Sequence, residues 1–338
     1  MKAKNTPLIF LTGTFLLGNS IINLPFSKYP SNTFLGFIIA LLISLPLFIF
    51  FDRYNQSVLH QKNGILNKIF LSLFAVTCLF YGLISMRNFI TFSDKTILPE
   101  INSFFPIILY LLLLFLFCIF DKRVIIKTAF ICGLVILFIM LTMFIFSFKN
   151  FRLNGLLKFN NISIKGLLYE SLSYICLSFI PSIALIIFVP KSKNEHRGIF
   201  IKGFLFGALL LAVSFLQSTL IFGYNLLSGL NHPYASSISI ITIGNNYSRL
   251  EGFSYLIYFA ASLIKTTVCV YSSKEVLETI YPKAKKIFLP LILILFGAVS
   301  YFVEPFKNIE FSKIAPYILL RFIMVLPLFF RKEKTVKV

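Results

Sequence analysis

The stretch GNSIINLP (Gly18–Pro25) interrupts a segment that is otherwise apolar enough to cross a membrane. A glycine lowers the cost of leaving a helix, and a proline removes a backbone donor and kinks the turn that follows. In hydrocarbon, an unwound backbone persists only where protein buries it or where it lines a cavity. The stretch therefore predicts a broken membrane helix, a device with which transporters bind solutes near the midplane. The plainer alternative is that Gly and Pro are simply frequent in membrane helices.

Composition places the whole chain in a membrane. Of its 338 residues, 58% are hydrophobic and 42 are Phe, whereas an ordinary soluble domain is about 45–50% apolar. Several windows reach the roughly 20 apolar residues that a bilayer requires. We expect an all-α polytopic membrane protein with ten transmembrane helices. The candidate spans are 7–27, 33–51, 68–92, 104–120, 124–148, 167–189, 199–223, 252–272, 285–303 and 314–330.

The basic residues indicate how these spans are oriented. The formal net charge is +20, with 32 Lys and Arg against 12 Asp and Glu. With both termini in the cytoplasm, 20 of the cations lie on the cytoplasmic side and 10 lie outside, in agreement with the positive-inside rule. The cations are scattered over short loops, which favours contact with anionic membrane lipid and argues against a nucleic-acid partner. No linker divides the chain, so we expect one membrane-embedded domain over residues 1–338.

A second interruption lies in the other half of the chain. The sixth span contains SYICLSFIPS (Ser173–Ser182), and Ser178 lies as far into this span as Gly18 lies into the first. Each interruption opens a group of five predicted helices. We therefore expect a LeuT-like 5+5 inverted repeat with broken helices 1 and 6, the repeats covering about residues 7–148 and 167–330.

Two cations lie well inside predicted spans and a third lies toward the outer end of the third span; a charge there is costly unless it meets carbonyls, water or an anion. They are, in that order, Lys265, Arg321 and Arg87. Lys265 has three interpretations: it replaces a coupling cation beside the broken first span, it attracts a ligand carboxylate, or its long stem snorkels to the cytoplasmic interface. For Arg321 we favour snorkelling or a structural pair.

Enzyme chemistry finds little support in the sequence. The three His residues, His60, His196 and His232, lie in predicted loops without metal-ligand spacing. The chain has neither a glycine-rich phosphate loop nor a Ser/His/Asp arrangement. A ten-helix membrane acyltransferase would carry a catalytic His within the membrane, and none of the three His lies in a predicted span. We interpret the five Cys as buried hydrophobes, and we expect no enzyme activity, no catalytic residues, no metal and no cofactor.

The segment HPYASSISIITIGNNYSRLEGFSYLIYFAASLIKTTVCVY (His232–Tyr271) carries a specific order of residues. A proline in the loop and an isoleucine-rich run come first. The triplet Arg249-Leu250-Glu251 then stands at the mouth of the eighth span, and Lys265 lies on that helix ahead of a tyrosine. This order goes beyond what hydrophobicity requires.

Two other stretches complete the pattern. MRNFITFSDKTILPE (Met86–Glu100) places an Arg before a Leu-Pro at the outer end of the third span, and FIPSIALIIFVPKSKNEHRGIFIKG (Phe179–Gly203) runs from the sixth span through a basic loop into the seventh. With GNSIINLP, these stretches resemble the spore-germination permeases, the GerAB-type B subunits of nutrient germinant receptors within the amino acid–polyamine–organocation superfamily. The chain departs from that family where Pro181-Ser182 replaces a common Gly-Glu pair, and in having no Trp.

The resemblance implies a membrane subunit that senses a small nutrient, such as an amino acid, in the spore inner membrane and signals to A-type and lipoprotein C-type partner subunits. Backbone amides near Gly18–Ile21 would hold the nutrient's carboxylate. The expected substrate-binding residues are Gly18, Asn19, Ser20, Ile21, Tyr174, Ser178, Phe179 and Pro181. Lys265 would replace a cation, and Arg87, Arg249 and Glu251 would act in gating or at an interface. The alternatives are an amino-acid transporter of the vegetative plasma membrane and a degenerate structural subunit.

Overall fold

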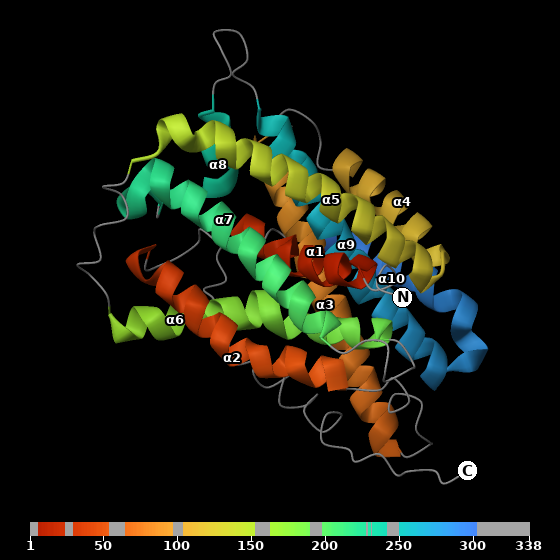
Figure 1. The fold of residues 1–338 in the computed structure, drawn as a ribbon. Helices are drawn as coiled ribbons and strands as arrows, with labels where there is room; N and C mark the ends of the chain where they lie inside the picture. Colours follow the sequence, from red (N-terminus) through yellow and green to blue (C-terminus); the bar gives the residue numbers. More distant parts are fainter. Residues whose placement is uncertain are drawn as a thin grey trace.

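The computed structural model describes residues 6–23, 30–53, 65–96, 104–152, 163–189, 198–227, 229–230, 232–241 and 250–302. All regular structure in these residues is helical (Figure 1). The α-helices are α1 (Thr6–Asn23), α2 (Thr33–Arg53), α3 (Ile65–Thr96), α4 (Phe104–Ile119), α5 (Lys122–Phe146), α6 (Ile164–Tyr174), α7 (Ile199–Leu227), α8 (Pro233–Ser239), α9 (Glu251–Ile280) and α10 (Lys285–Phe302). The π-helical η6 (Ile175–Phe179) and the 3-10 helix η7 (Ile180–Phe188) extend α6, and the other 3-10 turns are η2 (Pro30–Asn32), η4 (Ser147–Asn150) and η9 (Pro282–Ala284).

The positions of these helices confirm an all-α membrane fold. Each of the first nine predicted spans coincides with a helix of the described chain. The tenth span, 314–330, lies outside the described residues together with Arg321, so the count of ten stays a prediction. Among the described residues, four helices are by themselves long and apolar enough to cross a membrane: Lys68–Asp94, Lys122–Asn150, Ile199–Tyr224 and Glu251–Ile280.

The short helix α8 lies in the connection between the seventh and eighth spans, for which the sequence predicted only a loop. It begins at Pro233, directly after His232. Proline suits the first position of a helix, because the N–H that it lacks would find no intrahelical partner there. The signal for this helix was therefore present in the sequence.

The outer surface of the helices carries many large apolar side chains. Leu42 of α2, Phe138 of α5 and Ile294 of α10 are 68%, 72% and 72% exposed. A soluble monomer rarely exposes contiguous apolar patches larger than a few hundred Å². In a bilayer, such side chains lie against lipid at no cost, so this surface agrees with the membrane location that the composition predicts.

The helices form two groups that meet along α1 and α9. α1, α2, α7 and the chain from α6 to η7 pack against one another, whereas α3 runs along α9 and both contact α4 and α10. α5 contacts α1 and α9. Figure 1 shows α1 in the middle of the molecule, with α7 beside it. α1 is therefore the helix along which both groups can act on one ligand.

Close packing of α1 against α7 depends on small residues. A Cβ on Gly207 of α7 would lie 3.0 Å from the Cα and from the carbonyl oxygen of Gly13 on α1. Gly203, four residues earlier, faces Thr12, and its Cβ would lie 2.5 Å from the threonine Cβ. Gly-x-x-x-Gly spacing of this kind lets two membrane helices approach closely where burial of apolar surface gives no driving force.

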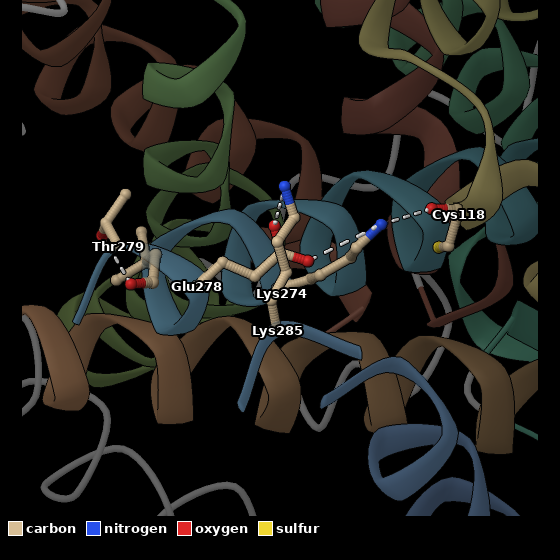
Figure 2. Close-up of polar contacts among 6 residues, drawn as sticks. Cys118, Lys274, Glu278, Thr279 and Lys285 are labelled. Atoms are coloured by element: carbon tan, nitrogen blue, oxygen red, sulfur yellow. Dashed lines mark hydrogen bonds and ion pairs between the residues drawn. The ribbon is translucent and has the colours of Figure 1, made fainter. Parts of the chain in front are cut away.

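Ionic contacts tie together the ends of three helices in the second group. Lys274 of α9 donates a 2.9 Å hydrogen bond to the carbonyl of Cys118, in the last turn of α4. Glu278 lies 4.0 Å from Lys274 and 3.5 Å from Lys285, the first residue of α10 (Figure 2). A cation at a helix C-terminus also interacts favourably with the helix dipole. These contacts fix the end of α9 to its neighbours.

Candidate functional site

The first helix does not break where the sequence suggested. α1 is α-helical throughout Gly18–Asn23, so the predicted interruption there is wrong for this conformation, and Leu24–Pro25 lie outside the described residues. The hydroxyl of Ser20 donates a 2.7 Å hydrogen bond to the carbonyl of Leu16, one helical turn earlier. Because amides inside an α-helix already bond to carbonyls, those of Gly18–Ile21 do not face a ligand in this state.

The polar residue of this stretch instead meets the sixth helix. A 2.6 Å hydrogen bond joins the hydroxyl of Ser20 to that of Ser178 in η6. Ser20 is 3% exposed and Ser178 is 1% exposed. The two predicted interruptions are therefore in direct contact, although they are 158 residues apart in the chain.

Gly18 is explained by close approach of a neighbour. A Cβ built on Gly18 would lie 2.4 Å from Cδ and 2.8 Å from Cβ of Lys265 on α9. The Lys265 side chain is 0% exposed, and its ammonium lies 5.4 Å from the centre of the Phe15 ring on α1. Such a cation over an aromatic face is stabilised by the ring quadrupole. Lys265 therefore does not snorkel to the surface; its side chain extends from α9 to Phe15 and Gly18 of α1.

The sixth helix changes its geometry within the predicted interruption and stays helical. The α-helix ends at Tyr174, and η6 is followed by η7, in which Pro181 occupies one of the first two positions. Pro181 cannot donate to the carbonyl four residues earlier, and in an α-helix its ring would collide with that carbonyl. π-helical and long 3-10 segments are uncommon and often mark functional sites or hinges.

The remaining predicted wall residues are buried in the same region. Tyr174 packs edge-on against Phe37 of α2 at 5.3 Å, and its buried hydroxyl has no hydrogen-bond partner among the described residues. Phe179 packs against Phe204 of α7, with ring centres 5.4 Å apart. Ile21 of α1 is 0% exposed.

Of the residues predicted for gating, Arg87 is held elsewhere. It donates to the carbonyl of Ser300 near the C-terminus of α10. Glu251 is exposed at the first turn of α9. Arg249 and the side chain of Asn19 lie outside the described part of the chain. The structure thus places Lys265 against Gly18, and Ser178 against Ser20, on the same stretch of α1, but it does not place the gating residues there.

A cluster around His232 was not predicted from the sequence, where this residue stands in a predicted loop without metal-ligand spacing. His232 Nδ1 lies 3.5 Å from the carbonyl of Ile22 in the last turn of α1, and its ring meets Phe92 of α3 at 4.9 Å. Phe92 also packs against Tyr258 of α9. Burial lowers the pKa of His232 from its ordinary value, and the Ile22 carbonyl partly offsets this. The loop ahead of α8 is therefore attached to both helix groups at the end of α1.

The arrangement is that of a LeuT-type transporter. A substrate-bound, outward-open Na⁺-coupled sialic acid symporter matches with a TM-score of 0.63 at 14% identity, over 96% of this chain and 79% of that chain. Mhp1, a nucleobase-cation-symport-1 family transporter, solved closed with bromovinylhydantoin bound, matches with a TM-score of 0.54 at 12% identity, over 96% and 75%. At such identities the likeness establishes the fold.

Within this fold class the family is also defined. The family model described as spore germination protein matches residues 4–312, and the chain belongs to that family. No curated protein sequence matches the chain significantly. The protein is therefore a transporter-like, germination-related integral membrane protein. The family and the solved neighbours consist of permeases and transporters rather than enzymes.

Proposed function

We propose that the chain is the membrane subunit of a spore germinant receptor, which senses a small nutrient such as an amino acid. Its membership of the spore germination family supports the receptor role, and the transporter fold supports binding of a small molecule. The observation that carries the proposal is the fully buried ammonium-bearing side chain of Lys265, packed against Gly18 of α1.

The nutrient binds, in this proposal, where α1 faces η6 and α9. A buried ammonium attracts a carboxylate strongly, because water does not compete for either group. The hydroxyls of Ser20 and Ser178, now 2.6 Å apart, supply further hydrogen bonds. Their bond to each other breaks, and each hydroxyl bonds to the ligand instead. Tyr174 contributes a buried hydroxyl without a hydrogen-bond partner in the described part of the chain, and Pro181 holds the helix in its non-α geometry beside it.

The nutrient also shifts a conformational equilibrium. Amides near Gly18–Ile21 can bind the carboxylate only if α1 opens, since the helix closes them in the present state. A ligand that binds only the open state stabilises that state by its binding free energy. We propose that this opening is the signal, passed to A-type and lipoprotein C-type subunits in the spore inner membrane, with both termini of the chain in the cytoplasm. The whole chain acts as one domain built from the two repeats.

Lys265 further suggests that binding needs no sodium. Its ammonium is covalently attached to α9 and cannot dissociate. It lies beside α1, where it takes the place of a coupling cation. We expect the same nutrient affinity in sodium chloride and in choline chloride at equal ionic strength. A strict requirement for Na⁺ would contradict this part of the proposal.

The test of the function is a ligand panel. Amino acids, sugars and nucleosides are added to purified protein, and thermal unfolding is followed. A ligand at about 100 times its dissociation constant stabilises the folded state by about 2.7 kcal/mol. The stabilising compound should also trigger germination of spores that carry this chain and not of spores that lack it. A compound that stabilises the protein but triggers both kinds of spore equally would contradict the receptor role.

The second candidate is an amino-acid transporter of the vegetative plasma membrane. It is favoured by the solved neighbours, both of which are described as transporters or symporters. Uptake of the stabilising compound into liposomes that contain only this chain would support transport. Genes for A- and C-type subunits beside that of this chain would instead support the receptor.

A further inference from the structure

Two residues beside Lys265 on α9 bond to a tyrosine on α4. The hydroxyl of Tyr110 lies 2.8 Å from Oγ1 of Thr266 and 3.0 Å from Oγ of Ser262. Tyr110 is 1% exposed, and Ser262 and Thr266 are 0% exposed. One phenol therefore holds two successive turns of α9, on either side of Lys265 in the sequence.

α3 completes this hydroxyl clasp, which consists of Ser85, Tyr110, Ser262 and Thr266. Ser262 donates a 2.9 Å hydrogen bond to the carbonyl of Ser85, and the two serine hydroxyls lie 3.2 Å apart. Thr266 also lies 3.4 Å from the carbonyl of Gly82. Each hydroxyl of the clasp has partners on another helix, so the clasp joins α3, α4 and α9 without a charge.

The clasp differs from what Ser and Thr do elsewhere in these helices. Thr77, Thr142 and Thr219 each donate to the carbonyl four residues earlier in their own helix. That bond is the easiest one for a hydroxyl in a membrane helix, because it needs no neighbour. Ser262 and Thr266 instead bond across to other helices, which fixes how α9 lies against them.

The ring of Tyr110 is itself held in place. Phe89 of α3 and Phe259 of α9 pack against it, with ring centres 5.6 Å and 6.1 Å away. In an α-helix each residue is turned by about 100° from the one before. The clasp therefore binds a face of α9 next to the face that carries Lys265. A rotation of α9 that moved Lys265 away from Gly18 would break the hydrogen bonds of the clasp.

We infer that Tyr110 is a positioning residue, which sets the rotation of α9 and thereby holds Lys265 against α1. The inference rests on the proposed function only in that Lys265 is the group that binds the nutrient. Tyr110 itself contacts α9 through Ser262 and Thr266, so it acts on the nutrient only through Lys265. Its role is to keep the ammonium where α1 presents Gly18.

The test removes one oxygen and leaves the ring. In Tyr110→Phe, the contacts to Phe89 and Phe259 remain while both hydrogen bonds to α9 are lost. Hydrogen bonds between membrane helices are modest in strength, so we expect the displaced state of Lys265 to become roughly three- to ten-fold more populated. Reactivity of Lys265 toward a small amine-specific reagent, measured by mass spectrometry on the ligand-free protein, should rise by the same factor. Thr77→Val, which removes a hydroxyl that donates to the Leu73 carbonyl within α3, is the matched control and should not change it.

The outcomes separate this inference from the proposed function. Increased labelling of Lys265 in Tyr110→Phe, with none in Thr77→Val, supports the positioning role. Unchanged labelling in Tyr110→Phe overturns it. Nutrient affinity is then measured in the same proteins and in Lys265→Gln. Increased labelling combined with unchanged affinity in Lys265→Gln would leave the positioning role standing and would reject Lys265 as the nutrient-binding group.

Discussion

The side chain of Lys265 fills the space in which any residue other than glycine at position 18 would carry its Cβ. The aliphatic stem lies against α1, 2.4 Å from that Cβ position at its closest atom. This contact joins the two groups of helices at Gly18 of α1 and places a cation in the interior of the protein. Gly18 therefore serves close approach in this conformation, rather than an open turn.

Gly18→Ala should destabilise the protein. The added methyl group would overlap the Cβ and Cδ atoms of Lys265, and relief requires α1 and α9 to separate. Overpacking of this kind costs about 1–3 kcal/mol. Thermal unfolding of the purified protein measures it. Gly252→Ala, with nothing within 4 Å of the new Cβ, is the control, and equal melting temperatures for the two variants would refute the contact.

The hydrogen bond between Ser20 and Ser178 should appear as coupling in a double-mutant cycle. Each single change to Ala removes the 2.6 Å contact between α1 and η6, so the second change adds less than it does alone. Membrane hydrogen bonds measured in this way average about 0.6 kcal/mol. Strict additivity of the two changes in unfolding free energy would show that the helices are not joined there.

Pro181→Ala should relax the sixth helix. The alanine regains an N–H and removes the ring that obstructs a continuous α-helix, so hydrogen exchange of the amides in 175–188 should slow. The nutrient response should weaken if the non-α geometry is needed for signalling. Pro46→Ala in α2 provides the control, since that proline lies within an otherwise regular α-helix. A full nutrient response in Pro181→Ala together with slower exchange of these amides would show that signalling does not need the non-α geometry.

The His232 cluster predicts a loss of stability in acid. Burial lowers the folded-state pKa of His232, so the unfolded chain binds the proton more readily. This contribution is complete above the ordinary pKa of about 6.5 and is lost as the pH falls below it toward the folded-state pKa. Melting temperatures between pH 8 and pH 5 test this in the wild type and in His232→Gln. Identical pH profiles in the two proteins would exclude His232 as the cause.

Sequence patterns predicted the helices well and their internal geometry less well. Long apolar runs have few alternatives in a bilayer, and nine predicted spans match described helices for that reason. The interruption at Gly18 was misjudged, because a glycine that opens a helix and one that admits a neighbouring side chain look alike in sequence. The partner that distinguishes them, Lys265, is 247 residues away and becomes adjacent only through the fold.

The site was predicted in part for the same reason. Ser20, Ser178 and Lys265 were each selected as unusual polar residues in apolar segments, and the structure brings Ser178 to Ser20 and Lys265 to Gly18 on α1. Tyr110 was not selected, because a tyrosine in an apolar run is unremarkable until its hydroxyl meets Ser262 and Thr266. Contacts of that kind depend on how three helices pack.

The central claim is that the Lys265 ammonium binds the carboxylate of the nutrient. It is tested most directly by comparing the affinity of the stabilising amino acid with that of its carboxamide, in the wild type and in Lys265→Met. Hydrogen bonds to charged groups contribute about 1.5–3 kcal/mol, so the wild type should prefer the acid by about 10- to 100-fold. Lys265→Met should lose most of this preference, because only the backbone amides near Gly18–Ile21 then remain to bind the carboxylate. An undiminished preference for the acid in Lys265→Met would contradict the account.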